Sequence, residues 1–204
     1  MEKDKEYQVQ VRNLNKSFGD NRVLVNLNVN FEKDKITVIT GPSGCGKTTL
    51  LNIISGMEQP DSGEVIMKDR SISFIFQEDR LIPDLTVYRN IEFVLKSTLS
   101  EQESKPIIEK YLDLVKLKEA KDKYPEQLSG GMKRRVAIAR AFAYRSDLLI
   151  MDEPFKGLDE KLKKEIIDEF LRIYNQDKRT IILVTHDMDE AVFLGDAIID
   201  LNCS

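Results

Sequence analysis

Residues 41–48 read GPSGCGKT, and they match the G-x-x-x-x-G-K-[ST] pattern of a phosphate-binding loop. The glycines of this pattern let the backbone turn tightly, so that its N–H groups point at phosphate oxygens. Lys47 supplies a positive charge for the β- and γ-phosphates, and Thr48 supplies a hydroxyl group for Mg²⁺. The stretch therefore predicts a site for a nucleoside triphosphate. Its candidate binding residues are Gly41, Pro42, Ser43, Gly44, Cys45, Gly46, Lys47, Thr48 and Thr49.

The residues on either side of the loop have the patterns that the motif requires. Residues 36–40 read ITVIT, which predicts a buried strand, and residues 49–54 read TLLNII, which predicts a helix. A strand, a loop and a helix in this order direct the positive helix N-terminus at the same anion. The alternative is a glycine-rich turn with only a structural role.

The composition excludes several classes of protein. The chain of 204 residues fits one domain, or one domain with a subdomain, and needs neither disulfides nor metals to hold its core. A net charge of −4 argues against a general nucleic-acid binder.

The two cysteines, Cys45 and Cys203, indicate a reducing compartment rather than a disulfide. Cys45 is either a redox switch or a small residue tolerated in the loop. No apolar run reaches the length of a membrane span, and the charged N-terminus does not resemble a signal peptide.

Hydrophobic periodicity predicts an α/β fold. Apolar residues alternate over residues 7–14 and 24–31, which predicts an antiparallel pair of strands joined through a turn at 19–21. Further strands are predicted over 64–67, 71–76, 148–151, 180–185 and 197–201, and helices over 87–96, 103–115, 132–143, 159–175 and 188–194. Strands that alternate with helices indicate a parallel sheet covered on both faces. We therefore expect a single P-loop NTPase domain, with an N-terminal antiparallel β subdomain and a helical subdomain inserted at about 78–143.

Two adjacent carboxylates follow a buried strand at residues 148–153, which read LLIMDE. Asp152 stands where a nucleotide site holds Mg²⁺, directly or through water. Glu153 can position and deprotonate the attacking water. The alternative is a turn that only caps a helix, but the phosphate loop elsewhere in the chain favours the functional interpretation.

A second glycine-rich helix start lies at residues 128–131, which read LSGG. Ser129, Gly130 and Gly131 can form a second anion cradle, or Ser129 can be an ordinary N-cap before a flexible turn. One γ-phosphate is most easily bound by both cradles when they belong to two different subunits. The three basic residues that follow, at 133–135, are predicted to lie on a solvated helix face.

Two further polar residues come directly after apolar strands. His186, the only histidine of the chain, follows residues 180–185 at the end of a predicted parallel strand, where open α/β sheets bind ligands. Its imidazole can hydrogen-bond a γ-phosphate there, although a lone histidine is more often structural. Gln77 follows the strand at 72–76 and can reach Mg²⁺ or the attacking water, and the alternative is an ordinary surface glutamine.

Taken together, these motifs resemble the ATP-binding subunit of an ABC transporter, and the resemblance covers nearly the whole chain. It depends on an ordered set of motifs, namely GPSGCGKTT, Gln77, LSGGM with KRRVAIARA after it, LLIMDEP, GLD at 157–159 and His186. The resemblance implies ATP and Mg²⁺ as cofactors. It also implies that Phe18, in NKSFG, stacks on adenine, that Gln77 senses Mg²⁺ and contacts the membrane subunit, and that His186 contacts the γ-phosphate.

The same resemblance implies partners and a place in the cell. Ser129 and Gly131 match residues that close over ATP bound by a partner subunit, and Asp159 matches an aspartate that links the two sites of the dimer. The expected partners are a transmembrane permease subunit, a second copy of the chain or a paralogous ATPase subunit, and a solute-binding protein, with no nucleic acid. The expected location is the cytoplasmic face of the cell membrane, through the permease.

Details of the motifs favour one subgroup of the family. DEPF with Phe155, and LSGGM with Met132, resemble importers of the nitrate, sulfonate and taurine type. Two features depart from this subgroup, namely a short segment between Gly63 and Gln77 and a chain that stops soon after the last predicted strand. The short length is shared with the lipoprotein-release and cell-division relatives. Two other functions are alternatives, namely a soluble ABC-type ATPase that acts on nucleic acid or ribosomes, and a nucleotide-binding regulator without turnover. The acidic balance of charge argues against the first, and the presence of Asp152, Glu153 and His186 argues against the second.

Overall fold

The structure is a computed structural model that describes residues 6–68 and 71–201, so that Cys203 lies outside the described residues. The described chain forms two compact units. The first contains the residues up to 72 together with 147–154 and 179–201, and the second contains 73–146 and 155–178. The predicted helical segment at 78–143 thus falls in the second unit, which also includes the amphipathic helix predicted at 159–175.

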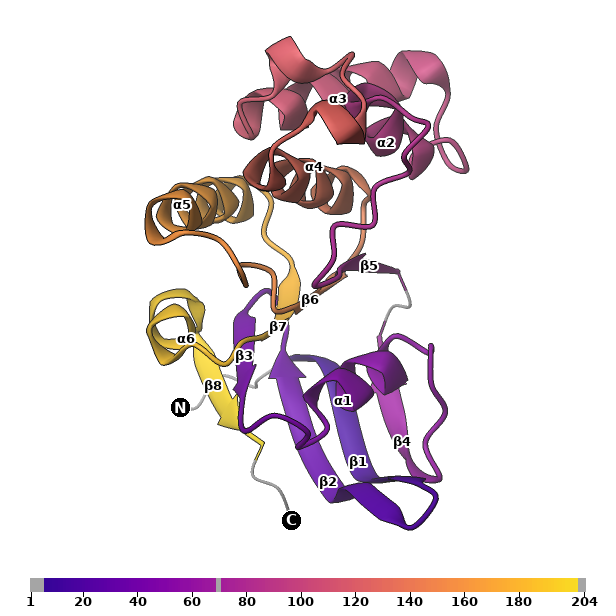
Figure 1. Cartoon of the computed structure of the whole chain (residues 1–204). Helices are drawn as coiled ribbons and strands as arrows, with labels where there is room; N and C mark the ends of the chain where they lie inside the picture. Colours follow the sequence, from indigo (N-terminus) through magenta and orange to yellow (C-terminus); the bar gives the residue numbers. More distant parts are fainter. Residues whose placement is uncertain (1–5, 69–70, 202–204) are drawn as a thin grey trace, which may run out of the picture. The chain divides into compact units, whose positions relative to one another are not determined.

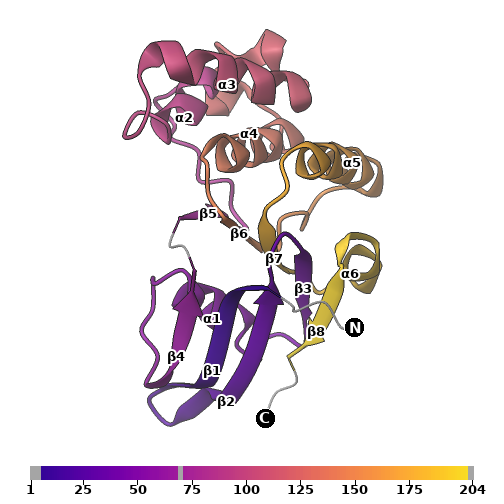
Figure 2. The ribbon, with the colours of Figure 1, turned by 180° about the vertical axis from the view of Figure 1, so that it is seen from behind.

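The first unit begins with an antiparallel sheet of the order β2-β1-β4, whose strands run side by side in Figures 1 and 2. Its strands are β1 (Tyr7–Phe18), β2 (Asn21–Glu32) and β4 (Ser62–Met67). Phe18 pairs with Asn21, so the connecting turn is Gly19 and Asp20, one residue shorter than the predicted turn at 19–21 because Asn21 belongs to β2. Both long strands extend beyond the predicted ranges, because the alternating apolar pattern weakens toward the turn while the backbone pairing continues.

A second sheet has the order β5-β6-β7-β3-β8. Its strands are β3 (Ile36–Thr40), β5 (Ile72–Ile75), β6 (Leu148–Asp152), β7 (Thr180–Val184) and β8 (Ala197–Asp200). The pairs β6–β7, β7–β3 and β3–β8 are parallel. Every residue of β3 and β7 is buried, which is the pattern of strands covered on both faces. The predicted parallel-sheet core is therefore confirmed.

The parallel direction of these strands brings their carboxyl ends to one edge of the sheet. Asp152 at the end of β6 pairs with Val184 at the end of β7, which in turn pairs with Ile39 near the end of β3. The phosphate loop and α1 (Lys47–Ile54) follow β3, and α6 (Met188–Leu194) follows β7. Each strand thus delivers its following loop to the same place, where open α/β sheets bind ligands.

The second unit is helical. It contains α2 (Val87–Phe93), α3 (Glu101–Leu114), α4 (Gly130–Ala143), α5 (Glu160–Gln176) and two short 3₁₀ turns, Lys118–Ala120 and Pro125–Gln127. Helix α4 lies between α3 and α5 in both views (Figures 1 and 2). Phe142 of α4 and Phe155 both pack against Phe170 of α5, with ring centroids 5.9 Å and 6.2 Å away. None of the helices in the described residues is long and apolar enough to cross a bilayer.

Candidate nucleotide-binding site

The first unit has a cavity of about 350 Å³ beside the phosphate loop. Its lining combines an aromatic side chain, the loop and an acidic residue from the end of β6. The residues that line it are Phe18, Val23, Ser43, Gly44, Gly46, Lys47, Thr48, Thr49 and Glu153. Phe18 leaves 51% of its surface exposed, so a planar ligand can reach its ring. An aromatic side chain and a cationic loop that line the same cavity are suited to a nucleotide.

The backbone of the phosphate loop requires glycine at two positions. Gly46, at the start of α1, has φ 96°, and a Cβ atom there would lie 2.8 Å from Leu24 Cδ2 and 2.9 Å from Val23 Cγ1. Gly41 has φ 137°, and its Cβ would lie 2.4 Å from the carbonyl oxygen of Leu201. Left-handed backbone and close packing thus explain the two outer glycines of the motif.

The ammonium group of Lys47 lies within the loop. Lys47 is only 8% exposed, and its Nζ donates hydrogen bonds to the carbonyl oxygens of Gly41 and Pro42, both at 2.8 Å. These bonds fix the long side chain in one position. The positive charge is therefore preorganised at the point where the motif predicts the terminal phosphates.

Thr48 and Asp152 form the link between the phosphate loop and β6. The hydroxyl group of Thr48 donates a hydrogen bond to Asp152 Oδ2 at 3.1 Å. A hydroxyl and a carboxylate are the oxygen ligands that Mg²⁺ prefers in sites that it shares with substrate phosphates. The donor set at this position therefore fits the predicted metal.

Glu153 and His186 come together from the ends of β6 and β7. Glu153 has the left-handed φ of 44°, and its backbone N–H donates to the carbonyl of Val184 at 2.9 Å. Its Oε1 lies 3.6 Å from Nδ1 of His186, whose side chain is 59% exposed whereas that of Glu153 is 16% exposed. The loop after β7 is fixed by Thr185, whose hydroxyl donates to Glu190 Oε2 at 2.7 Å. A strained backbone that directs a carboxylate into a cavity is a feature of functional sites.

Cys45 of the phosphate loop is buried in the first unit, and the other predicted site residues lie in the second unit. Ser129 is the N-cap of α4, and its hydroxyl accepts a hydrogen bond from the N–H of Met132 at 3.3 Å. Asp159 is the N-cap of α5 and accepts from the N–H of Leu162 at 3.1 Å. A Cβ atom on Gly131 would lie 2.6 Å from Leu162 Cδ2, so the two helix starts are in contact. Gly130 has open space around it, and Gln77 is exposed.

The prediction that residues 133–135 form a solvated face was wrong for two of the three. Arg134 is 5% exposed, and its guanidinium group donates to the carbonyls of Phe76 at 2.8 Å and Gln77 at 2.5 Å. Its Nε lies 3.1 Å from Asp79 Oδ1. Arg135 has a side chain that is 15% exposed, and its Nε lies 3.0 Å from Glu169 Oε2. The loop after β5 presents carbonyl groups that have no strand partner, and an arginine satisfies several of them at once.

A sequence signal for this buried arginine was available. Arg134 stands four residues before Ile138 and seven before Ala141, which are buried positions on one stripe of α4. The sequence pattern also did not predict a role for Arg140. This side chain donates to the carbonyls of Arg80 at 2.8 Å and Asp79 at 3.0 Å. Burial lowers the pKa of Arg134 and raises the pKa of Asp79, while the attraction between the two opposes both changes.

Comparison with known proteins gives a consistent result. The sequence pattern of the family described as ABC transporter matches residues 24–156. The chain is 40% identical over 209 residues to the sulfate/thiosulfate import ATP-binding protein CysA of Pectobacterium atrosepticum, covering 95% of this chain and 63% of that protein. It is 41% identical over 206 residues to the spermidine/putrescine import ATP-binding protein PotA of Thermotoga maritima, covering 96% of this chain and 56% of that protein. The chain thus spans about three fifths of the length of these relatives.

Solved structures resemble the chain over almost its full length. A dimeric structure of a post-hydrolysis state of an ATP-binding cassette, bound to ADP and Pi, superimposes with a TM-score of 0.82. It is 32% identical in sequence, and the match covers 96% of both chains.

The buried ion pair predicts a pH-dependent loss of stability. Arg134→Met removes two hydrogen bonds to carbonyls and leaves Asp79 without its nearest cation, which should cost roughly 2–3 kcal/mol of unfolding free energy at neutral pH. The pKa of Asp79 is already raised in the folded state, and the substitution raises it further. A carboxyl group whose pKa is higher in the folded state than in the unfolded state, where it is about 4, destabilises the fold as pH rises above that value. The loss of unfolding free energy caused by Arg134→Met should therefore shrink as pH falls toward about 4.

Urea unfolding of the two proteins between pH 4 and pH 7 measures this deficit. Lys164→Met, which replaces an exposed lysine of the same unit, is the matched control and should show no such dependence. A deficit that stays constant with pH would contradict the role given to the Arg134–Asp79 pair.

Proposed function

The chain belongs to the ABC transporter family, and on this premise we propose that it is the ATP-binding and ATP-hydrolysing subunit of an ABC importer. The observation that carries the proposal is the cavity beside the phosphate loop, which is lined by Phe18, Lys47, Thr48 and Glu153. One cavity thus offers a surface for a base, a cradle for phosphates and a carboxylate for the reaction. The structural relative with ADP and Pi supports the choice of ATP as the nucleotide.

Nucleotide binding uses Phe18 and the phosphate loop, which both line the cavity. Phe18 stacks on adenine, and the loop N–H groups with Lys47 hold the β- and γ-phosphates. Thr48 and Asp152, whose Oγ1 and Oδ2 atoms lie 3.1 Å apart, would hold Mg²⁺. The resemblance to the family gives Gln77 a role at the same metal. The metal supplies positive charge to the β- and γ-phosphate oxygens when it is bound.

Hydrolysis uses the pair at the ends of β6 and β7. Glu153 accepts the proton of a water molecule whose oxygen attacks the γ-phosphorus, and the bond from that phosphorus to the β–γ bridging oxygen breaks. His186, 3.6 Å from Glu153, donates a hydrogen bond to the γ-phosphate and orients the carboxylate. The products are ADP and inorganic phosphate.

We propose that the chain works as one ABC-type ATPase domain in an ATP-dependent dimer. The N-caps Ser129 and Asp159 start two helices that contact each other through Gly131 and Leu162. Ser129, Gly130 and Gly131 then close over ATP bound by the partner subunit, which is a second copy or a paralogue. The dimeric structural relative supports this assembly.

The proposed partner beyond the dimer is a transmembrane permease, which holds the chain at the cytoplasmic face of the membrane. Leu81 and Ile82, which follow Gln77, are half-buried, and Pro83 is exposed. This segment couples the nucleotide site to the permease, because Gln77 moves with the γ-phosphate. A solute-binding protein completes the importer.

Selectivity for the transported solute resides in other subunits. The two relatives are named for sulfate or thiosulfate and for spermidine or putrescine, which carry opposite charges, at 40% and 41% identity. The finer proposal of a nitrate, sulfonate or taurine importer depends on Phe155 and Met132. Phe155 is 1% exposed and packs against Phe170, so its identity also has a packing reason. Two alternatives to the importer remain. One is the ATPase of an export, lipoprotein-release or cell-division complex, and the other is a soluble ATPase that acts on nucleic acid or ribosomes.

The proposed chemistry predicts different effects for two substitutions. Glu153→Gln should retain ATP binding and lower the hydrolysis rate by about 10²–10⁴, because it removes the base and keeps the shape of the side chain. Lys47→Ala should weaken ATP binding itself, because it removes the charge inside the loop. Phosphate release and nucleotide binding, measured on both variants, separate the two effects. Parental turnover by Glu153→Gln would assign the base to another residue.

The proposed dimer predicts complementation between two inactive variants. ATP should drive dimerisation of Glu153→Gln, and ADP should not, as measured by light scattering. A mixture of Lys47→Ala and Ser129→Ala chains should regain ATPase activity, because each heterodimer contains one site with an intact loop and an intact Ser129. A protein that remains monomeric with full ATPase activity would contradict the composite site.

The proposed permease contact predicts crosslinks that depend on nucleotide. Cysteines at Leu81 and Leu85, in a chain with Cys203→Ser, should crosslink to a membrane protein in vesicles that contain the candidate permease. The pattern should change between ATP and ADP, whereas a cysteine at the exposed Lys164 should not crosslink. Sedimentation with ribosomes or DNA, with no membrane protein captured, would instead support the soluble ATPase.

A further inference from the structure

Lys16 is a buried lysine close to the nucleotide cavity that no step of the proposed reaction uses. It lies on β1 two residues before Phe18 and is 9% exposed, although lysine is rarely buried unless it is paired. Its ammonium group lies over the ring of Phe18, 5.0 Å from the ring centroid. This is within the distance at which a cation is attracted to an aromatic face.

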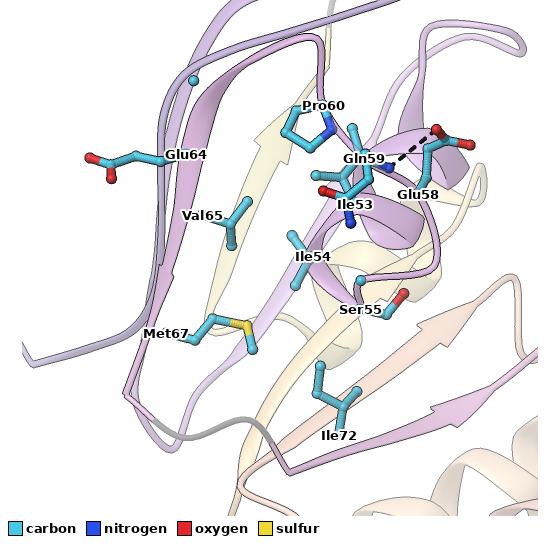
Figure 3. Close-up of a pocket in the computed structure, with 12 residues that line it drawn as sticks. Ile53, Ile54, Ser55, Glu58, Gln59, Pro60, Glu64, Val65, Met67 and Ile72 are labelled. Atoms are coloured by element: carbon cyan, nitrogen blue, oxygen red, sulfur yellow. Dashed lines mark hydrogen bonds between the residues drawn. The ribbon is translucent and has the colours of Figure 1, made fainter.

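The ammonium group is held by the turn that follows α1. Lys16 Nζ donates to Glu58 Oε1 and to the carbonyl of Gln59, both at 2.8 Å, and lies 3.6 Å from Asp61 Oδ1. The hydrogen bond to Glu58 raises the pKa of Lys16, so the amine remains charged at neutral pH. The carboxylate of Glu58 also accepts from the N–H of Gln59 at 3.2 Å, as Figure 3 shows.

The same turn is tied to β1 by the backbone on either side of Lys16. The N–H of Ser17 donates to Asp61 Oδ2 at 2.7 Å, and the N–H of Asp61 donates to the carbonyl of Asn15 at 2.9 Å. These bonds leave Lys16 little freedom. The ammonium group is therefore fixed relative to the β1 backbone that carries Phe18.

Residues of the turn also line a second cavity. This cavity has a volume of about 500 Å³ and is lined by Glu58, Gln59 and Pro60 together with apolar residues that include Ile54 and Val65 (Figure 3). Side chains therefore do not pack tightly behind the turn. Polar bonds to β1 help to fix its position, and Lys16 makes two of them. The N–H of Glu58 also donates to the carbonyl of Asn52 in α1 at 3.1 Å.

We propose that Lys16 is a positioning residue for base recognition, which fixes the Phe18 ring for stacking by an ammonium group anchored on residues 58–61. The proposal rests on the proposed ATP site and deepens it. The ammonium lies over the ring of an otherwise exposed side chain, and it limits the orientations of that ring before nucleotide binds. Preorganisation of this kind strengthens binding by lowering the entropy cost of ordering the ring.

Lys16 affects base binding through the ring of Phe18, so its loss should weaken the binding of ligands that carry a base and spare those that do not. Lys16→Met keeps an unbranched side chain, one atom shorter than that of lysine, and removes the charge. We expect it to weaken ATP binding about three- to tenfold and to leave the affinity for inorganic tripolyphosphate unchanged. The KM for ATP should rise to the same degree, with kcat unchanged. Isothermal titration calorimetry with each ligand and steady-state ATPase assays measure these quantities.

Three further variants control the experiment. Lys16→Arg retains the cation and should retain most of the ATP affinity, and Lys35→Met, which changes a half-exposed lysine paired with Asp196, should leave it unchanged. In a Phe18→Leu background, Lys16→Met should cause no further loss of ATP affinity. Glu58→Gln loosens the anchor and should reproduce the loss selective for ATP, which tests the proposal even if Lys16→Met does not fold.

The outcomes distinguish this proposal from the ATP site itself. An equal loss of ATP and tripolyphosphate affinity in Lys16→Met would show a general structural role and overturn the proposal. Unchanged ATP affinity in both Lys16→Met and Glu58→Gln would overturn it as well, while the ATP site would stand. If the parental chain binds tripolyphosphate and does not bind ATP, the proposed ATP site is contradicted, and the role of Lys16 is contradicted with it.

Discussion

The candidate site depends on the parallel pairing of β6 with β7 and of β7 with β3. Because these strands run in the same direction, their carboxyl ends meet at one edge, and the three loops that follow are delivered together. The hydrogen bond between Thr48 and Asp152 joins the first residues of α1 to the last residue of β6 across this edge. A reversal of any one of these strands would remove its side chain from the site.

The same edge accounts for the unusual backbone of the site. Gly41 and Gly46 adopt left-handed conformations that leave no room for a Cβ atom, and Glu153 adopts one although it has a Cβ. The N–H of Glu153 bonds to the carbonyl of Val184, so β7 holds the strained residue in place. The buried sheet thus stabilises conformations that isolated loops would not keep.

In the second unit, arginine side chains hold the loop after β5 by bonding to its carbonyl groups, whereas the strands of the first unit are held by backbone pairing. The loop after β5 leaves the sheet, and the guanidinium groups of Arg134 and Arg140 on α4 bind its carbonyls. Helix α4 begins at Gly130, after its N-cap Ser129, so one helix connects the segment at Gln77 to residues 128–131.

The sequence alone determined the phosphate loop, the alternation of strands and helices, and the residues that could act on a nucleotide. These features are local, since each motif depends on residue types at short spacing, and α6 and β3 have the predicted bounds. Only the tertiary structure decided which polar residues are buried. Arg134 and Lys16 look like surface residues in their own segments, and each is buried by carbonyl and carboxylate groups from residues more than forty positions away in the chain. Local pattern cannot report such partners, because the free energy of burying a charge depends on groups that only the fold brings into contact.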